Sequence, residues 1–401
     1  MSDSKAPHAP ELLDVDLEED RYSRLRLIPW WDQERLHAAT VMVVGAGALG
    51  NEICKSLALL GIGRTFVIDM DTIEDTNLTR SVLFRHEDEG KAKATVVARA
   101  MRAINPDAKV RPYVGNVVYE LGQGVFGDVD IVLGALDNRE ARVHINSTCW
   151  KLGKPWVDGA IEVVQGVARM FVPPEGPCYE CTMSELDYKL LSMRRSCALL
   201  TRDDIIEGKV PTTPTSASII AGIQVQEAVK WLHRDRDLPL LDGKGFVFNG
   251  LTNDSYVVQY QRRSDCPAHE SLGQVIPTDF CTQAVTAGEM LQFVRAQVSP
   301  QAVLEFDLEL CTGWLCRKCG HTETVFRPLG ALSGKDAVCP ECGELREPQL
   351  THAIYGHEEF LERTLADIGL PPYDIVHGRD GMDARHFLLA GDREMVLGEI
   401  A

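Results

Sequence analysis

Two pairs of cysteines in the last third of the chain have the spacing of a metal site. Cys316 and Cys319 form one C-x-x-C pair, and Cys339 and Cys342 form a second pair after 19 intervening residues. Tetrahedral Zn²⁺ binds four thiolates that two tight turns present, and this spacing is typical of a zinc ribbon. Basic and acidic residues balance at five each over 311–350, so we expect this ribbon to stabilise the fold or to dock a protein.

A second set of possible zinc ligands is split along the chain. Cys178 and Cys181 form another C-x-x-C pair, and Cys266 and His269 repeat that spacing 88 residues later. Zinc accepts three thiolates and one imidazole. These four residues predict a second zinc site. The alternative is a cysteine pair without metal and a histidine on the surface.

A glycine-rich segment follows the apolar run at 41–44. Its residues of interest are Gly45, Ala46, Gly47 and Gly50. When such a turn joins a strand to a helix, backbone N–H groups and the positive helix end can bind phosphate. Asp69 ends the next apolar run, where a carboxylate could hold a ribose hydroxyl. Taken alone, these residues fit an NAD-dependent oxidoreductase as well as they fit an enzyme that binds another nucleotide.

The polar residues that come next fit a nucleoside triphosphate better than a nicotinamide cofactor. They are Asp71, Asn77, Arg80, Lys93 and Asp137. Hydride transfer needs a dry pocket, whereas Arg and Lys stabilise the charge of attack on an α-phosphate and of pyrophosphate release. A carboxylate at the carboxyl end of a strand can hold Mg²⁺, which favours Asp137. The alternative is surface charge, with Asp137 capping a helix.

One cysteine outside the predicted metal sites has the surroundings of a nucleophile. Cys54 and Cys149 lie in predicted helices among apolar neighbours, as inert buried thiols do. Cys197 instead follows two arginines and a serine, within a long polar segment at 183–213. Neighbouring cations lower the pKa of a thiol toward the reactive thiolate, so Cys197 is the predicted nucleophile.

Composition excludes several classes of protein. The chain has 401 residues, 45% hydrophobic and 25% charged, which predicts two or three globular domains. A net charge of -18 opposes binding to nucleic acid and to anionic membranes. No apolar run is long enough to span a bilayer and the first residues lack the pattern of a signal peptide, so we expect a cytoplasmic protein.

The residues that could do chemistry are interleaved with alternating strand and helix patterns. This alternation predicts an α/β fold with a Rossmann-like, doubly wound and mostly parallel sheet. Extended segments without long helices between them, from residue 157 onward, predict added antiparallel strands. The first domain would span 21–270, and a smaller C-terminal domain at 271–401 would contain the zinc ribbon and a short amphipathic helix at 358–368. Residues 1–20, with seven acids and one lysine, would form a flexible acidic tail.

Over residues 21–270 the chain resembles the superfamily of ThiF, MoeB and ubiquitin-activating enzymes. The glycine loop, a D-x-D-x-x-x-x-x-N-L-x-R segment, a G-x-x-K segment and a later D-N pair occur in the family's order. The resemblance implies that Asp69 binds the ATP ribose and that Asp137 binds Mg²⁺. It also implies that three residues contact the phosphates: Asn77, Arg80 and Lys93. Ala48 and Ser81 depart from residues common in the family, but neither change removes a charge.

Two further elements carry the same resemblance. Arg21-Tyr22-Ser23-Arg24 matches an R-Y-x-R element whose second arginine reaches the ATP site of the neighbouring subunit, so Arg24 implies a dimer. Activating enzymes carry their thioester cysteine in the crossover loop before a P-T-T element like Pro211-Thr212-Thr213, which supports Cys197. About 13 residues separate Cys197 from Pro211, more than in compact relatives.

The resemblance implies an ATP-dependent enzyme, most like a bacterial activating enzyme for a ubiquitin-like protein. The C-terminal glycine of that protein would be adenylated, passed to Cys197 as a thioester, and transferred to a conjugating enzyme or another thiol carrier. One alternative is MoeB/ThiF-type adenylation that feeds sulfur transfer to a sulfur carrier protein. Another is a non-catalytic half of a heterodimer. The expected cofactors are ATP, Mg²⁺ and two Zn²⁺ ions, and the expected assembly is a homodimer.

Overall fold

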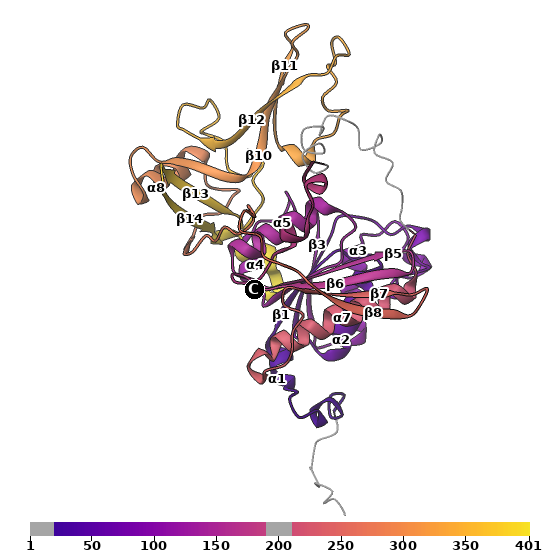
Figure 1. Cartoon of the computed structure of the whole chain (residues 1–401). Helices are drawn as coiled ribbons and strands as arrows, with labels where there is room; N and C mark the ends of the chain where they lie inside the picture. Colours follow the sequence, from indigo (N-terminus) through magenta and orange to yellow (C-terminus); the bar gives the residue numbers. More distant parts are fainter. Residues whose placement is uncertain (1–19, 190–210) are drawn as a thin grey trace, which may run out of the picture.

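A computed structural model describes residues 20–189 and 211–401, and these residues form two β-sheets (Figure 1). The first sheet has eight strands in the order β3-β2-β1-β4-β5-β6-β7-β8. The first five strands in that order run parallel, and the last three are antiparallel additions. This topology confirms the predicted doubly wound sheet. The strands are β1 Thr40–Val44, β2 Arg64–Asp69, β3 Lys109–Val114, β4 Ile131–Gly134, β5 Trp156–Glu162, β6 Gln165–Phe171, β7 Lys244–Asn249 and β8 Asp254–Gln259.

The central strands of this sheet send alternate side chains into two separate cores. Val41 and Val43 of β1 pack in the first core, whereas Met42 and Val44 pack in the second. All five residues of β1 are buried, as in a parallel strand that is covered on both faces. Successive side chains of a strand point to opposite faces, so the near-continuous apolar run at 41–44 supplies both cores.

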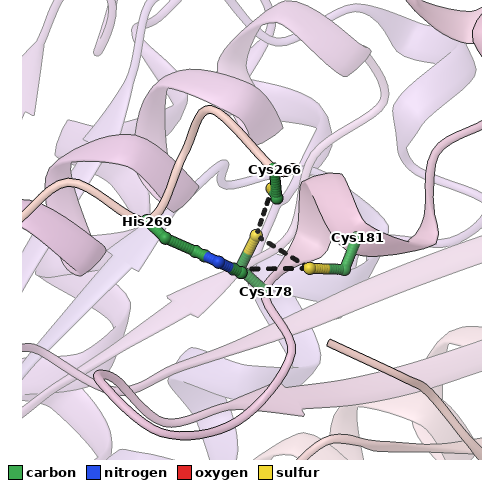
Figure 2. Close-up of side chains that lie close together, drawn as sticks. All are labelled: Cys178, Cys181, Cys266 and His269. Carbon is green, nitrogen blue, oxygen red and sulfur yellow. Dashed lines mark hydrogen bonds between the residues drawn. The ribbon is translucent and has the colours of Figure 1, made fainter. Parts of the chain in front are cut away.

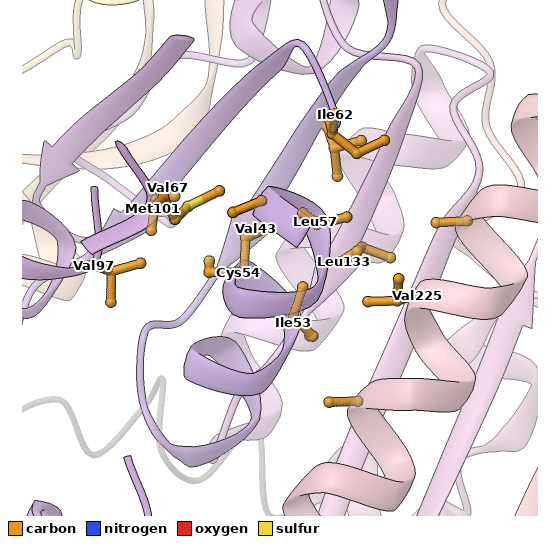
Figure 3. Packing of buried hydrophobic residues seen from close by; sticks show 14 of the residues in the cluster. Val43, Ile53, Cys54, Leu57, Ile62, Val67, Val97, Met101, Leu133 and Val225 are labelled. Atoms are coloured by element: carbon orange, nitrogen blue, oxygen red, sulfur yellow. The ribbon is translucent and has the colours of Figure 1, made fainter. Parts of the chain in front are cut away.

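Helices cover both faces of the first sheet. α2, α3 and α7 contribute residues to the first core, and α4 and α5 to the second. Figure 3 shows the first core, where Ile53 and Leu57 of α2 pack near Val43 and Leu133 of the sheet. The helices, with the short α1 that precedes β1, are α1 Gln33–Ala38, α2 Ala48–Leu60, α3 Lys93–Ile104, α4 Gly124–Gly127, α5 Arg139–Lys151 and α7 Pro214–Leu232.

The second sheet is built almost entirely from the last third of the chain. Its strands have the order β11-β10-β13-β14-β9, and β12 also pairs with β10. One half of the long strand β10 pairs with β13. The other half pairs with β11 and with β12, and these three strands form the β10–β12 ribbon, which extends away from the first sheet (Figure 1). The elements are β9 Val275–Thr278, α8 Ala287–Gln297, β10 Val303–Leu315, β11 Thr322–Pro328, β12 Glu347–Ile354, β13 Ile375–Asp380, β14 Asp383–Leu389 and α9 Arg393–Leu397.

The end of the chain returns to the first sheet and completes its second core. Val396, Leu397 and Ile400 are buried there among side chains of β1 and β2. The Arg111 guanidinium on β3 donates hydrogen bonds to the carbonyl groups of Met395 at 2.7 Å and Val396 at 2.8 Å. The C-terminus accordingly lies against the first sheet in Figure 1. A cut at residue 270 would expose this core.

The prediction of a helix at 358–368 is wrong, because this segment forms a series of turns. Two of its carbonyl groups, those of Leu361 and Arg363, accept hydrogen bonds at 2.8 and 2.9 Å from Gly288 and Ala287 at the start of α8. These N–H groups have no partner within their own helix. Leu365 is fully buried in the core of the second sheet, so the apolar residues of this segment indicated burial even though the segment is not a helix.

None of the described helices is both long enough and apolar enough to cross a membrane.

Candidate nucleotide site and metal centres

Three adjacent strands, β2, β1 and β4, bring the predicted nucleotide-binding segments together at their carboxyl ends. The N–H of Gly45 donates to the Ile68 carbonyl at 2.8 Å, and the N–H of Ala135 donates to the Val44 carbonyl at 2.8 Å. Ligands of open α/β sheets bind at this edge. The glycine loop, Asp69 and the segment after β4 therefore border one site.

The glycines of the loop meet two different requirements. Gly45 has φ +95°, and a Cβ there would lie 2.3 Å from the Ala135 carbonyl oxygen. A Cβ on Gly50 would lie 1.9 Å from the Gly45 oxygen, so loop packing excludes a side chain at both positions. A Cβ on Gly47 would have no heavy atom of the other described residues within 4 Å, apart from those of Gly47 and its two chain neighbours. Gly47 precedes the first turn of α2, so the start of this helix has the open space that a phosphate group would fill.

Asp69 ends β2 and is oriented by two backbone groups. One carboxylate oxygen accepts a hydrogen bond from the Ala46 N–H at 2.6 Å, and the other accepts one from the Asp71 N–H at 2.8 Å. Burial raises the pKa of Asp69, and the nearby Lys93 charge opposes that rise. Each oxygen keeps a lone pair, so the carboxylate can still accept a hydrogen bond from a ribose hydroxyl.

The two predicted phosphate-binding cations lie in the segments after β2. Lys93 is the first residue of α3, and its ammonium group forms a 2.8 Å ion pair with Asp71. Arg80 donates to the Thr76 carbonyl at 2.8 Å, and the Asn77 side chain accepts a backbone hydrogen bond at the start of its own turn. Arg80 and Asn77 are half-buried. Both cations would have to exchange these protein partners for phosphate oxygens.

Asn51 ties this region to the glycine loop and was missed by sequence reasoning. Its buried amide donates to the carbonyl groups of Ala46 at 2.7 Å and Gly47 at 3.0 Å. Its side-chain oxygen accepts the N–H of Leu83 at 2.8 Å. The available signal was an amide side chain directly after Gly50, at the start of a helix whose buried residues are mostly apolar.

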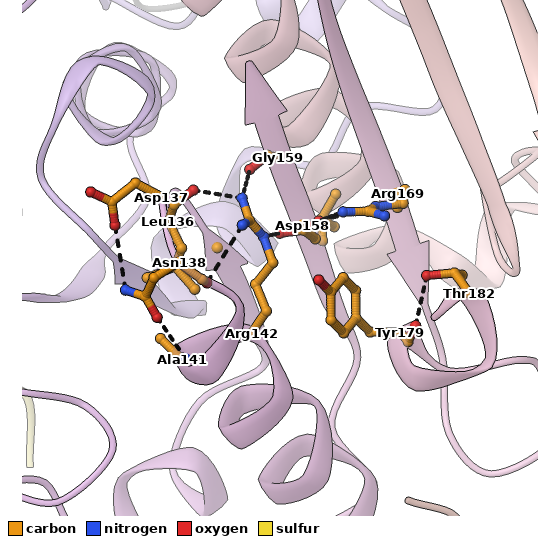
Figure 4. Close-up of polar contacts among 12 residues, drawn as sticks. Leu136, Asp137, Asn138, Ala141, Arg142, Asp158, Gly159, Arg169, Tyr179 and Thr182 are labelled. Carbon is orange, nitrogen blue, oxygen red and sulfur yellow. Dashed lines mark hydrogen bonds and ion pairs between the residues drawn. The ribbon is translucent and has the colours of Figure 1, made fainter. Parts of the chain in front are cut away.

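Asp137 does not cap the helix that follows it. The cap of α5 is Asn138, whose side-chain oxygen accepts the N–H of Ala141 at 2.9 Å (Figure 4). Asp137 is exposed beside it, with one carboxylate oxygen 3.4 Å from the Asn138 amide nitrogen. Asp137 as a helix cap is therefore wrong, whereas surface charge and a Mg²⁺ ligand both stay open for this exposed carboxylate.

A buried charge network lies directly behind this segment. Arg142 donates to the Asp158 carboxylate at 2.8 Å, to the Gly159 carbonyl at 3.2 Å, and also to the Leu136 carbonyl (Figure 4). The other oxygen of Asp158 accepts from Arg169 at 3.0 Å. Asp158 is fully buried, and although burial opposes it, the two guanidinium groups hold its pKa below the usual range. Two cations on one carboxylate leave an excess of one positive charge behind Asp137. No local sequence pattern signals this network.

The four residues of the split cysteine set converge (Figure 2). The Cys178 sulfur lies 3.7 Å from that of Cys181 and 3.5 Å from that of Cys266, and the Cys181 sulfur lies 3.3 Å from His269 Nε2. Ligands of a tetrahedral zinc with 2.3 Å Zn–S bonds are about 3.8 Å apart. The Trp150 ring stacks on His269 with a centroid distance of 4.5 Å, which holds the imidazole in place. The donor set and its spacing fit zinc.

The second cysteine group forms two matching turns at the end of the β10–β12 ribbon. The sulfur of Cys316 lies 3.5 Å from that of Cys342, and the sulfur of Cys319 lies 3.6 Å from that of Cys339. The backbone N–H of Cys319 helps to hold the pKa of the Cys316 thiol near 6, which favours the thiolate. In each turn a glycine with positive φ follows the second cysteine: Gly320 at +76° and Gly343 at +74°. This donor set also fits zinc.

The predicted nucleophile Cys197 lies outside the described residues. Downstream of it, the chain is anchored where the Pro211 carbonyl accepts the Val163 N–H at 2.7 Å, and Thr213 caps α7. Burial raises the pKa of Cys54 and of Cys149 well above the usual value, as expected for inert thiols. Among the described cysteines outside the two clusters, none has a lowered pKa, since the pKa values of Cys281 and Cys311 are also raised by burial.

Arg24 is exposed at the start of a short 3₁₀ turn, Leu25–Leu27. Its neighbour Arg21 has an intramolecular role, because its guanidinium donates to Asn105 at 2.9 Å and to the Ile104 carbonyl at 2.8 Å. The Arg24 side chain is thus accessible to a second molecule, and its contact with a second subunit stays a prediction.

A family model described as ThiF family matches residues 20–268, which is more than half of the chain. The chain belongs to the ThiF family. The SAMP-activating enzyme E1 of Haloferax volcanii is 34% identical over 251 residues, which cover 62% of this chain and 87% of that protein. The fold, the order of the motifs and this likeness confirm the family resemblance that the sequence predicted.

Other relatives of this ThiF-family chain are matched over a smaller share of their length. The sulfur carrier protein adenylyltransferase of Thermus thermophilus is 39% identical over 40% of this chain and 63% of its own length. The ubiquitin-like modifier-activating enzyme 5 of Dictyostelium discoideum is 28% identical over 60% of this chain and 65% of its own length. The chain thus covers slightly less than two thirds of these two relatives.

A solved structure gives the same relationship in three dimensions. Escherichia coli MccB, crystallised with ATP, superposes with a TM-score of 0.53 and 25% identity, over 64% of this chain and 75% of that one. Residues 20–268, which the family model matches, contain the first sheet and three of the four residues of the split cysteine cluster, and His269 lies one residue beyond them. The β10–β12 ribbon and the rest of the second sheet lie beyond the residues that the family model matches.

Proposed function

We propose that this ThiF-family chain activates the C-terminal carboxylate of a small ubiquitin-like or sulfur-carrier protein by adenylation with ATP. The observation that carries this proposal is the convergence of the glycine loop, Asp69 and Asp137 at the carboxyl ends of three adjacent strands. The names of the relatives support the same kind of reaction and substrate.

The proposed roles follow from chemistry and position. The start of α2 and the glycine-loop N–H groups bind phosphate oxygens, and Asp69 accepts a hydrogen bond from the ribose. Arg80 and Lys93, with the Asn77 amide, neutralise the charge on the triphosphate. The partner's carboxylate oxygen then bonds to the α-phosphorus, the bond to the β-phosphate oxygen breaks, and pyrophosphate leaves. The product is an acyl-adenylate.

Asp137 is the carboxylate that we propose as the Mg²⁺ ligand, with Asp71 as a neighbouring acid in the site. Bound Mg²⁺ would neutralise phosphate charge. Asp137 suits this role because it is exposed at the strand end and is not committed to capping α5. The two cysteine clusters are proposed zinc sites that stabilise the fold, since neither contacts the residues of the glycine loop.

The next step in the proposal is transfer to Cys197. Its thiolate attacks the acyl carbon, the C–S bond forms, and AMP leaves as the C–O bond to phosphate breaks. The two preceding arginines favour the thiolate. The thioester then passes to a conjugating enzyme or another thiol carrier. We place the enzyme in the cytoplasm as a homodimer, with Arg24 completing the partner subunit's site and with no role for nucleic acid or membranes.

A rival version ends in sulfur transfer, in which a sulfur donor converts the acyl-adenylate to a thiocarboxylate. The name of the T. thermophilus relative favours it. The mass of the partner protein distinguishes the two versions, because a thiocarboxylate persists on the released partner, whereas a thioester leaves it attached to the enzyme.

The test of adenylation is ATP–pyrophosphate exchange that depends on a small protein ending in glycine. We expect Asp137→Asn to abolish exchange. Cys197→Ala should leave exchange intact and abolish the thiol-sensitive adduct, whereas Cys281→Ala, which alters a half-buried thiol between β9 and α8, should preserve both. Absence of exchange and of ATP binding in the wild type would refute adenylation and favour the non-catalytic half of a heterodimer.

A mixing experiment tests the role of Arg24. If Arg24 acts in the partner's site, the separate variants Arg24→Ala and Asp137→Asn are inactive but regain activity together, because the mixed dimer contains one intact site. Arg26→Ala provides a nearby control, since Arg26 pairs with Asp20 of its own chain at 2.7 Å. Failure of the mixture to recover any activity would contradict the dimeric arrangement.

A further inference from the structure

A cavity of about 140 Å³ lies where the end of α5 meets the second sheet. Its lining includes Lys151 at the end of α5, Glu270 in the connection after His269, and three histidines of the second sheet: His352, His377 and His386. None of these residues has a role in the proposed adenylation or in the two cysteine clusters.

Two of the histidines belong to a row across three neighbouring strands. Glu305 of β10, His377 of β13 and His386 of β14 lie directly opposite one another in the register of the sheet. Residues opposite each other share a face, with their side chains in contact. The Nδ1 atoms of His377 and His386 are 2.9 Å apart, and His377 Nε2 lies 3.5 Å from the Asp307 carboxylate.

One arrangement of the protons in this chain of groups leaves an imidazole nitrogen free to bind a ligand. Lys151 donates to Asp307 at 2.8 Å, and although burial opposes it, the contact with His377 helps to hold the pKa of Asp307 below its usual range. In this arrangement His377 carries its proton on Nε2, toward the Asp307 carboxylate 3.5 Å away, and its Nδ1 is an acceptor. The Nδ1–H of His386 then donates to it. The lone pair of His386 Nε2 is left free.

The other groups with free donor atoms at this cavity are Glu270 and His352. Both are exposed, and within residues 20–189 and 211–401 their side chains make no hydrogen bond or ion pair. Glu270 is close enough to His386 for its charge to act on that imidazole. By contrast, Asp307 and Glu305 are occupied by Lys151 and Arg379. Three carboxylates against these two cations leave the lining attractive to a positive ion.

We propose that His386, His352 and Glu270 bind a divalent transition-metal ion such as Zn²⁺, Co²⁺ or Ni²⁺. Imidazole and carboxylate together suit these ions. A metal-binding histidine typically donates its other N–H to an orienting partner, and His377 is placed to accept that hydrogen bond from His386. Three protein ligands would leave an open coordination position, unlike the cysteine clusters.

Binding at this site requires a small rearrangement. Among the described residues, groups of three or more possible metal ligands with all donor atoms within 4.8 Å of one another occur only in the two cysteine clusters. The His386 ring is held by its neighbours, whereas the exposed side chains of Glu270 and His352 are free to rotate toward it. The site is thus half preformed, and its metal should exchange more readily than that of a closed cysteine site.

Titration with Co²⁺ tests this proposal without reference to adenylation. The full-length protein is purified, its zinc content is measured, and Co²⁺ is added while the absorption spectrum is recorded. We expect one additional equivalent to bind with weak visible bands and without the near-ultraviolet charge-transfer band of a cobalt–thiolate bond. No additional equivalent, or one with that thiolate band, would overturn the proposal.

Variants identify the ligands. His386→Gln and His352→Gln should each lose the additional equivalent, whereas His357→Gln, which alters an exposed histidine stacked on Tyr355, should retain it. Asp307→Asn should weaken binding by about 10-fold to 100-fold, because an amide can donate as well as accept and no longer fixes the tautomer of His377.

Lys151→Gln breaks the same contact between α5 and the second sheet but leaves the acceptor of His377 in place, so it should change affinity by less than about threefold. His352 is exposed, so His352→Gln decides the matter even if His386→Gln does not fold. Retention of the additional equivalent by the His352 variant would refute the assignment.

Discussion

The buried charges behind the candidate Mg²⁺ ligand make a quantitative prediction. The side chain of Asp158 is fully buried, and those of Arg142 and Arg169 are 9% and 16% exposed. Asp158→Asn would leave two buried guanidinium groups without a counter-charge. Removing one partner of a buried pair costs about 3 to 5 kcal/mol, chiefly because the remaining charge is uncompensated. We expect a loss of unfolding free energy in this range.

A matched variant separates charge from shape. Arg169→Met removes one of the two cations and leaves Arg142 and Asp158 as a pair with no net charge, so no buried charge is left without a partner. Its expected cost is only about 1 kcal/mol, part of it from the lost contact of Arg169 with the Tyr179 ring. The two variants change the same network at adjacent positions, yet their predicted costs differ by about 2 kcal/mol or more.

Urea denaturation followed by circular dichroism measures both free energies at pH 7. Hydrogen exchange of the amides at 136–138 reports whether the segment that carries Asp137 has loosened, as expected for Asp158→Asn because Arg142 then loses its main anchor. A cost for Arg169→Met as large as that for Asp158→Asn would refute the charge argument. So would unchanged exchange at 136–138 in a strongly destabilised Asp158→Asn protein.

Three further predictions concern other parts of the molecule. Deletion of residues 393–401 should lower the unfolding free energy by about 5 kcal/mol, since it removes three buried apolar side chains from the second core. Urea denaturation measures this loss, and a loss under about 1 kcal/mol would contradict the packing. Cys339→Ser should lower the zinc content by one equivalent and open 311–350 to proteases while ATP binding persists, and an unchanged zinc content would exclude the ribbon site. Burial raises the pKa of Asp374 to about 6, so protonation of this carboxyl group stabilises the folded state. This contribution to the unfolding free energy is fully present below about pH 4 and is lost as the pH rises through 6. The unfolding free energy of the wild type should therefore fall by about 3 kcal/mol between pH 4 and pH 8 because of this group, and Asp374→Asn should remove that fall. Urea denaturation at each pH measures it, and identical pH profiles for the two proteins would contradict the argument.

Most of the first sheet could be predicted because its signals are local. The run at 41–44 is apolar throughout, as a strand buried on both faces must be, and Gly45 and Gly50 follow at positions where the loop has no room for a side chain. The cysteine clusters were equally accessible, because ligand spacing in sequence reflects the tight turns that a metal site requires. His269 could be found only through its spacing from Cys266.

The buried polar residues could not be predicted in this way. Arg142 lies in a helix and Asp158 in a strand, and each resembles a surface charge until its partner is known. Their contact joins segments that follow β4 and form β5, and it depends on the adjacent placement of those strands. The failed helix at 358–368 has a related cause, since its carbonyl groups bind the start of α8 rather than their own segment.

The same limitation applies to the C-terminal residues, with a consequence for the proposed site. Val396, Leu397 and Ile400 pack against the face of the first sheet that presents Met42 and Val44. In β1 these alternate with residues of the other core, and β1 ends at the glycine loop, so the position of that loop depends on packing at both faces. Loss of the chain end should therefore loosen the nucleotide site even though none of the removed residues belongs to it. Weaker ATP binding by a truncated protein that still folds would show this coupling, and unchanged ATP binding would show that α4 and α5 alone hold the strand in place.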